Sequence, residues 1–418
     1  MSDKARKKRT PFSELRPTTR RLILARGLRS FGQGALVVDF SLYLHALGWS
    51  SVAIGGLLSA AGLSGGLLSL LTGVLSDRLR RKPFLLFYEV VSFLAGTATL
   101  LSTNAVVIAI AAILVGYGRG ANGAAGPFSP AEQSWLAEEI DPRRRGQVYS
   151  FNAAVGFLGM GLGALIAMLP SFLHGVIGLI FAYRLLFLLV IIPSVVNFFL
   201  FYGAQEKYRR PPRCAGLPQR EREQEIHLRR QENSRLMRLM LVNAFNGLAI
   251  GLTGPLISYW FSLRFQVGPA AIAPVMGTSF LLTAMLSIWT GRISRRIGIV
   301  RPVVLERLAG LILYTVLPLV PLYWLASLLY LLRTVLSRGP AGAQQALTIG
   351  LVREQRRGLA VSLNTVSLLV PRSAGPAFSG YLLQLGLFGV PFYLAAALQS
   401  IYLLGYARFF RGYEPPRE

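Results

Sequence analysis

The chain has 418 residues, of which 53% are hydrophobic and 15% charged, and its mean hydropathy is +0.50. A composition this apolar excludes an ordinary soluble protein, whose whole surface meets water. A net charge of +26 is typical of proteins that bind nucleic acid. No basic stretch here carries interleaved aromatic residues or a recognisable nucleic-acid-binding module, so we expect no nucleic-acid partner.

Apolar runs long enough to cross a bilayer recur along the chain. A spanning helix needs roughly 20 mostly apolar residues, because it rises about 1.5 Å per residue across about 30 Å of hydrocarbon. The predicted spans are Leu28 to Leu47, Val52 to Leu75, Phe84 to Leu101, Ala105 to Phe128, Val148 to Leu169, Leu179 to Tyr202, Leu239 to Phe261, Ala270 to Trp289, Val303 to Leu322, Leu325 to Leu351, Leu359 to Leu382 and Val390 to Tyr406. The sequence therefore predicts an all-α integral membrane protein with twelve transmembrane helices.

Positive charge is concentrated in the N-terminal tail and in the connections that follow the even-numbered spans. The other connections carry little positive charge beyond Arg184 and Arg264. Lysine and arginine collect on the cytoplasmic side of membrane proteins, so the N- and C-termini are both predicted to be cytoplasmic. The basic connections are Arg78 to Lys82, Arg143 to Arg145, the central loop, Arg292 to Arg296 and Arg353 to Arg357.

The residues that hold metals are scarce and scattered. The chain has one cysteine, Cys214, and three histidines in different connections or helix ends, which are His45, His174 and His227. Metal sites and acid–base catalysis at a membrane need clustered acids and histidines. We therefore predict no metal, no cofactor and no enzymatic activity, with a membrane-embedded enzyme as the less favoured alternative.

The two halves of the chain repeat each other. The stretch from Ala131 to Asn152 aligns without a gap with the stretch from Ala343 to Asn364. GVLSDRLR, which begins at Gly73, echoes GRISRRIG, which begins at Gly291. In transporters, parallel halves of this kind usually flank a substrate site near the bilayer midplane.

A loop motif joins the second and third predicted spans. GVLSDRLRRKP, from Gly73 to Pro83, resembles the loop motif of the major facilitator superfamily (MFS). Arg80 stands where the family has glycine, and a left-handed turn there costs arginine more than glycine. The positions that match the family's gating motif include Gly73, Asp77, Arg78 and Arg81.

A second motif lies in the fourth span, where Arg119 and Gly123 resemble the family's Arg and Gly pair. In the tenth span, Arg338 and Arg333 are both candidates for the counterpart of Arg119, and the sequence does not choose between them. A Gly-Pro pair typical of the family's exporters is absent from the fifth span but present in the eleventh. Import and export therefore stay open.

The resemblance covers Leu22 to Tyr406 and implies two pseudo-symmetric six-helix bundles that work by alternating access as a monomer. Part of the central loop, Gln219 to Arg235, can form a polar helix on the membrane surface. The predicted units are a basic cytoplasmic tail at 1–21, an N-terminal bundle at 22–203, a cytoplasmic loop at 204–234, a C-terminal bundle at 235–407 and a cytoplasmic tail at 408–418.

Asp39 lies near the centre of the first span between apolar residues. An ionisable group at this depth costs several kcal/mol, so it pairs, lines a wet cavity or serves a function. The resemblance implies that the first span lines the central cavity and that an acid there carries the coupled proton. We predict that Asp39 is the proton-coupling residue. The alternative is a structural partner for Arg119 or another buried arginine.

Arginines inside the spans favour a cargo with an anionic group, because arginine keeps its charge and grips carboxylate or phosphate with two nitrogens. Polar amides in the same spans can complete a cavity, although lone amides also hold helices together. Glu89 and Glu306 are expected to brace loops, and Glu132 to lie at the cytoplasmic end of the fourth span. The predicted substrate-binding residues are Arg119, Arg333, Arg372, Gln33, Asn122, Asn243 and Asn246.

We therefore predict a secondary active transporter of a small molecule, coupled to protons, in the cytoplasmic or inner membrane of the cell. Its other partners are membrane lipids. The alternative is a lipid or amphiphile flippase or exporter on the same fold, in which basic cavity residues meet phosphate headgroups. The residues do not identify the cargo.

Overall fold

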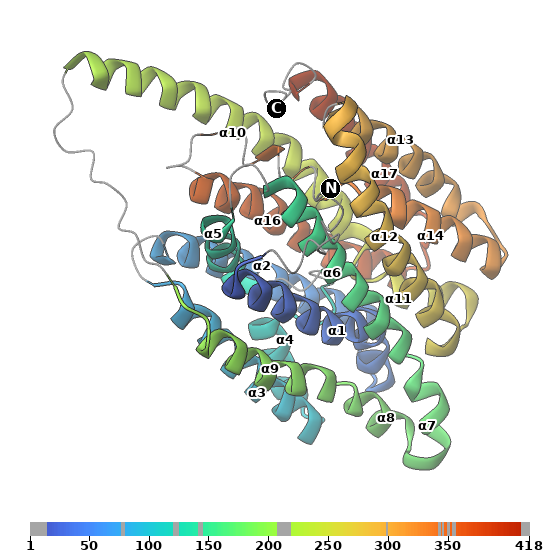
Figure 1. Ribbon diagram of the computed structural model, residues 1–418. Helices are drawn as coiled ribbons and strands as arrows, with labels where there is room; N and C mark the ends of the chain where they lie inside the picture. The colour runs from blue at the N-terminus through green and yellow to red at the C-terminus, as the bar shows by residue number, and fades with distance from the viewer. Residues whose placement is uncertain are drawn as a thin grey trace, which may run out of the picture.

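In the computed structural model, the described parts of the chain are helical. They contain α-helices and short 3-10 helices but no strand, which confirms the predicted all-α architecture. Figure 1 shows the helices packed side by side and elongated along a common direction. The described residues are 15–76, 80–119, 125–140, 145–206, 219–297, 300–341, 344, 347–348, 352 and 357–410.

The first half of the chain, up to Tyr202, forms one group of helices. α1 begins at Pro17. Proline is favoured at the first position of a helix, because an N–H there has no partner within the helix and proline has none to leave unpaired. α4 begins after Asn104, whose side chain accepts the Val106 N–H at 2.8 Å. The helices are α1 (Pro17–Ala46), α2 (Ser51–Ser76), α3 (Lys82–Leu101), α4 (Ala105–Val115), η1 (Gly126–Phe128), α5 (Ser129–Glu139), α6 (Arg145–Ile166), α7 (Leu169–Ile177), α8 (Leu179–Leu185) and α9 (Leu188–Tyr202).

The second half forms the other group. Each of the twelve predicted spans overlaps one helix or two consecutive helices. Seven helical segments of the described residues are long and apolar enough to cross a membrane, so the number twelve stays a prediction. The helices are α10 (Gln219–Thr253), α11 (Ile257–Phe265), α12 (Pro269–Ile297), α13 (Val300–Val316), η3 (Leu317–Leu319), α14 (Tyr323–Arg338), α16 (Arg357–Gln384) and α17 (Val390–Phe410).

The fourth predicted span is interrupted. It was expected to be one helix from Ala105 to Phe128, but α4 ends at Val115 and α5 begins at Ser129. Gly116 has a φ of +82°, and its N–H bonds to the Ala112 carbonyl, which closes the helix. Glycine adopts this left-handed conformation at little cost, so the apolar glycine-rich run can leave the helix. The prediction of a continuous helix is wrong here.

The predicted polar helix over Gln219 to Arg235 is present, and it forms the first half of α10. It is continuous with the seventh predicted span, so it projects beyond the bundle instead of forming a separate element (Figure 1). Arg229 donates to Glu225 one turn earlier at 2.7 Å, which supports the helix where it has few neighbours.

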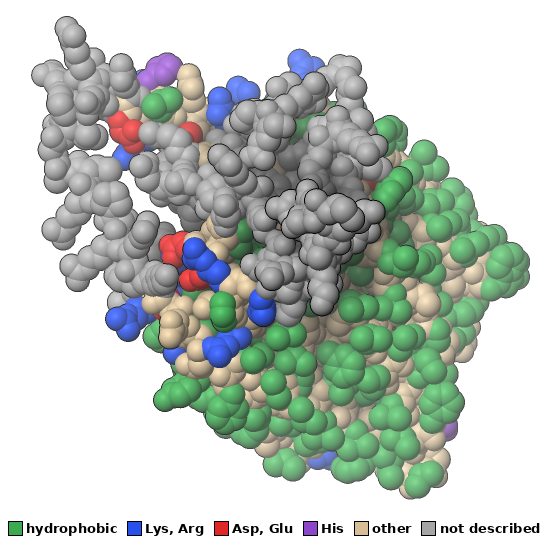
Figure 2. Space-filling model, viewed as in Figure 1, with side chains coloured by type: hydrophobic (Ala, Val, Ile, Leu, Met, Phe, Trp, Pro, Cys, Tyr) green, Lys and Arg blue, Asp and Glu red, His purple; other side chains and the backbone are tan. Residues whose placement is uncertain are grey.

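Much of the surface of the bundle is apolar. Figure 2 shows hydrophobic side chains over a broad face, with lysine, arginine and acidic side chains gathered toward the projecting part of α10. Large side chains on this surface are well exposed, among them Leu101, Val176 and Leu404. An apolar patch of this extent marks contact with a membrane, and not with water.

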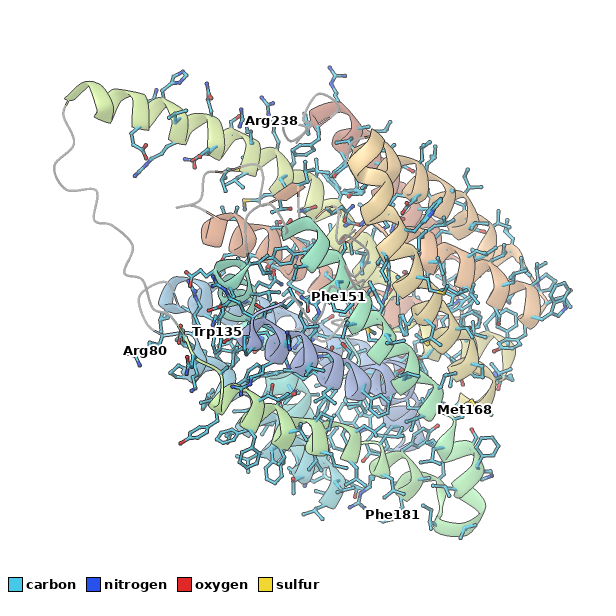
Figure 3. All side chains as sticks on the ribbon, in the orientation of Figure 1. Arg80, Trp135, Phe151, Met168, Phe181 and Arg238 are labelled. Carbon is cyan, nitrogen blue, oxygen red and sulfur yellow. The ribbon has the colours of Figure 1, made fainter. Side chains whose placement is uncertain are left out.

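The bundle has two distinct ends (Figure 3). We call the end that carries Arg80 and Arg238 the basic end, and the end that carries Met168 and Phe181 the opposite end. Toward the opposite end, one buried cluster runs through both halves and includes Phe40 and Trp260. Toward the basic end, the core divides into two clusters, one in each half. The halves are therefore joined through the opposite end.

The seam between the halves is formed mainly by two helix pairs, α2 with α16 and α6 with α12. Gly55 lies against the backbone of Pro376, so close that a Cβ at this position would clash with it. Hydrogen bonds also cross the seam, where small side chains let the helices approach each other. Examples are Ser41 with Ser258 at 3.2 Å, Ser51 with Tyr259 at 2.8 Å, Ser59 with the Ala377 N–H at 2.8 Å and Ser171 with the Ala270 N–H at 3.0 Å.

Candidate transport site

A cavity of about 30 Å³ lies within the first half, among α1, α3, α9 and the end of α4. This volume holds water but not a metabolite. Its polar side chains come from α1, α3, α9 and the turn after α4: Arg29, Gln33, Tyr88, Ser92, Tyr117, Arg119 and Ser194. Of the predicted substrate-binding residues, Gln33 and Arg119 therefore meet at this cavity.

Arg119 closes the broken end of α4. Its guanidinium donates to the carbonyls of Ala61 at 2.9 Å, Gly116 at 3.3 Å and Val115 at 3.4 Å. The C-terminus of a helix carries partial negative charge on its unpaired carbonyls, so a cation is stabilised there. Gly65 and Gly116 leave room for the guanidinium, since a Cβ on either glycine would overlap it.

Arg372 of α16 reaches across the seam to Arg119. One of its terminal nitrogens donates to the Arg119 carbonyl at 2.6 Å. Two further arginines lie on α14 and face aromatic rings. The guanidinium carbon of Arg333 is 4.2 Å from the Tyr314 ring centroid, and that of Arg338 is 5.2 Å from the Phe280 centroid. Within the described residues, none of these four arginines forms an ion pair with a carboxylate.

Asp39 is buried in α1, with 1% of its surface exposed. Neither carboxylate oxygen accepts a hydrogen bond from the described residues. Tyr183 of α8 faces it, and Tyr43 lies one turn along α1. The described residues show no ion pair between Asp39 and Arg119. Asp39 is thus an acid without a cationic partner in this part of the chain, set in an apolar core.

A group of buried charges lies beside the cavity, and the sequence analysis missed it. Arg29 of α1 contacts Glu89 of α3 and Glu132 of α5, at 3.0 Å and 2.9 Å respectively. We refer to these three residues as the acidic triad. The sequence assigned Glu89 to loop bracing because it is two turns from a helix end. The signal available was Arg29, an arginine inside the first predicted span.

The second half has its own polar cluster around Arg307 of α13. Arg307 donates to Asn246 at 3.1 Å and to Gln344 at 3.0 Å, and its guanidinium lies over the Tyr402 ring. Asn243 donates to Asn364 of α16 at 2.7 Å. Asn243 and Asn246 therefore bond to neighbouring helices, as glue between helices would do. Asn122, the remaining amide of the prediction, lies outside the described residues.

The gating loop motif is described in part. Gly73 lies in the last turns of α2, whereas Asp77 and Arg78 lie outside the described residues. Arg81 precedes α3 and forms an ion pair with Glu138 at 2.5 Å. Glu206 accepts the backbone N–H of Arg81 at 2.7 Å, which satisfies a free donor at the start of α3.

No group of three or more histidine, cysteine or acidic residues suited to a metal occurs in the part of the chain that the structure describes. A helical bundle with an apolar exterior, a duplicated sequence and buried charges in its interior is the architecture of a membrane transporter. The chain belongs to the Major Facilitator Superfamily, because the sequence pattern of that family matches residues 22–340.

The chain is similar to several known proteins. The chain is 23% identical over 386 residues to the uncharacterized membrane protein YJR124C of Saccharomyces cerevisiae, with 85% of each chain covered. It resembles the crystal structure of the human organic anion transporter MFSD10, with a TM-score of 0.67 and 16% identity over 96% of this chain and 100% of that one. The D-xylose–proton symporter gives a TM-score of 0.67 and 16% identity, covering 96% and 98% of the two chains. The chain is thus a multi-pass integral membrane transporter and not an enzyme.

Proposed function

We propose that the chain is a secondary active transporter that moves a small molecule with an anionic group by alternating access, driven by protons. The observation that carries this proposal is a set of four arginines inside the bundle that form no ion pair with a carboxylate of the described residues. Arg119 comes from the first half, and Arg333, Arg338 and Arg372 come from the second. A cargo between the halves would meet cations from both.

The charge balance of these arginines supports an anionic cargo. A buried cation without a counter-charge is costly, so an anion that enters beside it is stabilised. Arg372 donates to the Arg119 backbone carbonyl at 2.6 Å, so arginines from the two halves meet here, and arginine binds a carboxylate or phosphate through charge-assisted hydrogen bonds. One structural relative, MFSD10, is named an organic anion transporter.

The uneven seam supports alternating access. The hydrophobic core is continuous between the halves toward the opposite end and divided toward the basic end. If the basic end faces the cytoplasm, as lysine and arginine indicate, the cores of the halves are joined on the outer side in this conformation, and we infer a second conformation in which they are joined on the cytoplasmic side. Rocking of one half against the other would exchange the two arrangements. With this orientation, we infer that both termini of the chain are cytoplasmic.

Asp39 is suited to carry the coupled proton. A carboxylate in an apolar core without a cationic partner is stabilised when it binds a proton, and the ionised form returns when water reaches it. We infer twelve spans, a monomer in the cytoplasmic or inner membrane, protons as the coupling ion and no nucleic-acid partner. The D-xylose–proton symporter, which shares the fold, is named for the same coupling.

The cargo can be tested first by binding. A thermal-shift screen of the purified protein against carboxylates, phosphate esters and their neutral analogues should show stabilisation by anions, since a ligand of the folded state raises the midpoint of unfolding. Arg372→Gln should abolish the shift, whereas Arg229→Gln, on the projecting part of α10, should keep it. Equal shifts with neutral analogues would refute an anionic cargo.

Proton coupling can be tested in vesicles with the anion found by this screen. Asp39→Asn should lose uptake driven by a pH gradient and retain exchange of labelled for unlabelled cargo, because exchange needs no net proton movement. Glu225→Gln, which removes an acid outside the bundle, should behave as the unaltered protein. Gradient-driven uptake at the full rate in Asp39→Asn would contradict the role given to Asp39.

A further inference from the structure

The acidic triad combines one cation with two acids in a buried part of the first half. Arg29 is 7% exposed, Glu89 1% and Glu132 5%. The three side chains come from α1, α3 and α5, so the arrangement is a tertiary one. No residue of the triad belongs to the proposed proton-coupling and substrate-binding set.

The two acids are held unequally. Glu132 accepts hydrogen bonds from both terminal nitrogens of Arg29, at 3.0 Å and 2.9 Å, and a third from the Ala125 N–H at 3.2 Å. Glu89 has an ion pair from the Arg29 Nε to its Oε1 at 3.0 Å, and the amide of Asn197 on α9 lies near it. Within the described residues, neither Glu89 oxygen accepts a hydrogen bond of good geometry. Glu132 is therefore stabilised as a carboxylate, whereas Glu89 is the acid with the weaker support.

Charge counting then favours a proton on the triad. With both acids ionised, the triad itself has one guanidinium and two carboxylates, a net charge of −1, and the positive charge of Arg26 lies beside Glu132 and not beside Glu89. Two carboxylates that share one site cannot both ionise without a large cost in a low-dielectric interior. The charged groups facing Glu89 are Arg29 and Glu132. The Tyr88 hydroxyl is a further titratable neighbour, and Arg26, a half-buried residue on α1, faces Glu132.

A cavity large enough for a water molecule adjoins this group. The cavity of about 30 Å³ is lined by Arg29, Tyr88 and Ser92, and Ser92 lies one turn along α3 from Glu89. The Ser92 hydroxyl is buried and has no hydrogen-bond partner among the described residues. A water molecule in the cavity can pass a proton to this hydroxyl and from there to the carboxylate.

We infer that the acidic triad is a second proton-binding site, separate from Asp39, that takes up one proton on Glu89. In this step a hydronium ion gives its proton to the Glu89 carboxylate, which becomes a carboxylic acid, and leaves water. Nothing is oxidised or reduced. The link of this proton to transport rests on the proposed function, but the binding of the proton does not.

Infrared difference spectroscopy tests the site without any cargo, because a protonated carboxyl group absorbs at a frequency distinct from that of a carboxylate. The purified full-length protein is titrated with acid and base as the unaltered chain and as Glu89→Gln, Glu132→Gln and Asp39→Asn. Glu89→Gln should lose one carboxylic-acid band. Asp39→Asn should keep that band and lose a different one. Glu132→Gln should also lose the triad band, because Glu89 then pairs alone with Arg29 and ionises.

The outcomes separate the two proposals. Loss of the triad band in Glu89→Gln and Glu132→Gln, with retention in Asp39→Asn, supports the second site even if no transported anion is found. An unchanged set of bands in Glu89→Gln overturns it, whatever Asp39→Asn does in vesicles. If Glu89→Gln does not fold, Glu132→Gln becomes the deciding variant. Loss of the triad's carboxylic-acid band in that variant supports the second site, and persistence of the band overturns it.

Discussion

The two halves of the molecule place polar clusters at corresponding positions but give them different charges. In the first half, Arg29 holds Glu89 and Glu132 in a buried triad with two ion pairs. In the second half, Arg307 is the charged member, and Gln344 is an uncharged acceptor. The first cluster contains acids that can bind a proton, and the second contains amides.

The sequence repeat shows that the positions correspond. Gln344 aligns with Glu132, because each directly follows the alanine that opens its copy of the longer repeat. Arg307 follows Glu89 by the same number of residues as the second copy of the loop motif follows the first, so these two positions correspond as well. The two copies thus have a polar cluster at corresponding positions, but where the first half has two acids the second has an amide and a cation. Pseudo-symmetry of the backbone therefore does not imply symmetry of the chemistry.

The largest effect is expected from removing the central arginine of each cluster. Arg29→Met leaves two buried carboxylates without their cation and should lower the free energy of unfolding by about 3–5 kcal/mol. Arg307→Met leaves neutral amides and should cost about 1–3 kcal/mol. Denaturation of the purified variants in detergent measures both. Equal losses would show that the charge difference between the halves has no energetic consequence.

Exchanging Glu132 and Gln344 tests whether each half depends on the charge at this position. Glu132→Gln copies the second half into the first, weakens a bond to a charged group and should cost about 1.5–3 kcal/mol. Gln344→Glu copies the first half into the second and creates one ion pair with Arg307, which should change stability by less than about 1 kcal/mol, because a new buried pair roughly offsets its own desolvation. A larger loss of unfolding free energy in Gln344→Glu than in Glu132→Gln, by the same denaturation assay, would contradict the expectation that the first half depends more on its charge.

A smaller effect is expected at the seam that joins the halves. Gly55→Ala places a Cβ against the Pro376 backbone and should destabilise the protein by about 1–2 kcal/mol, because α2 must move away from α16. The adjacent Gly56 has no atom within 4 Å of a Cβ, so Gly56→Ala should stabilise the helix by about 0.5–1 kcal/mol. Thermal unfolding compares the two. Similar midpoints would mean that α2 and α16 are not tightly packed.

Several features could be predicted from residues alone. Hydropathy located the apolar runs, because the bilayer demands a fixed length of apolar helix whatever the partners. The self-alignment revealed the duplication, and the loop from Gly73 to Pro83 indicated the family. The break at Gly116 was missed, since a glycine-rich apolar run is compatible with a helix and with a turn until its neighbours are known.

By itself, the sequence determined that this chain is a helical membrane protein of two related halves, because composition, span length and repeats are local properties. It also marked Asp39 as an acid in an apolar stretch. The tertiary structure decided which charges meet. Arg29, Glu89 and Glu132 lie on three helices far apart in the chain, and Arg119 meets Arg372 across the seam. Their pairing depends on how the helices pack, which no single stretch of sequence specifies.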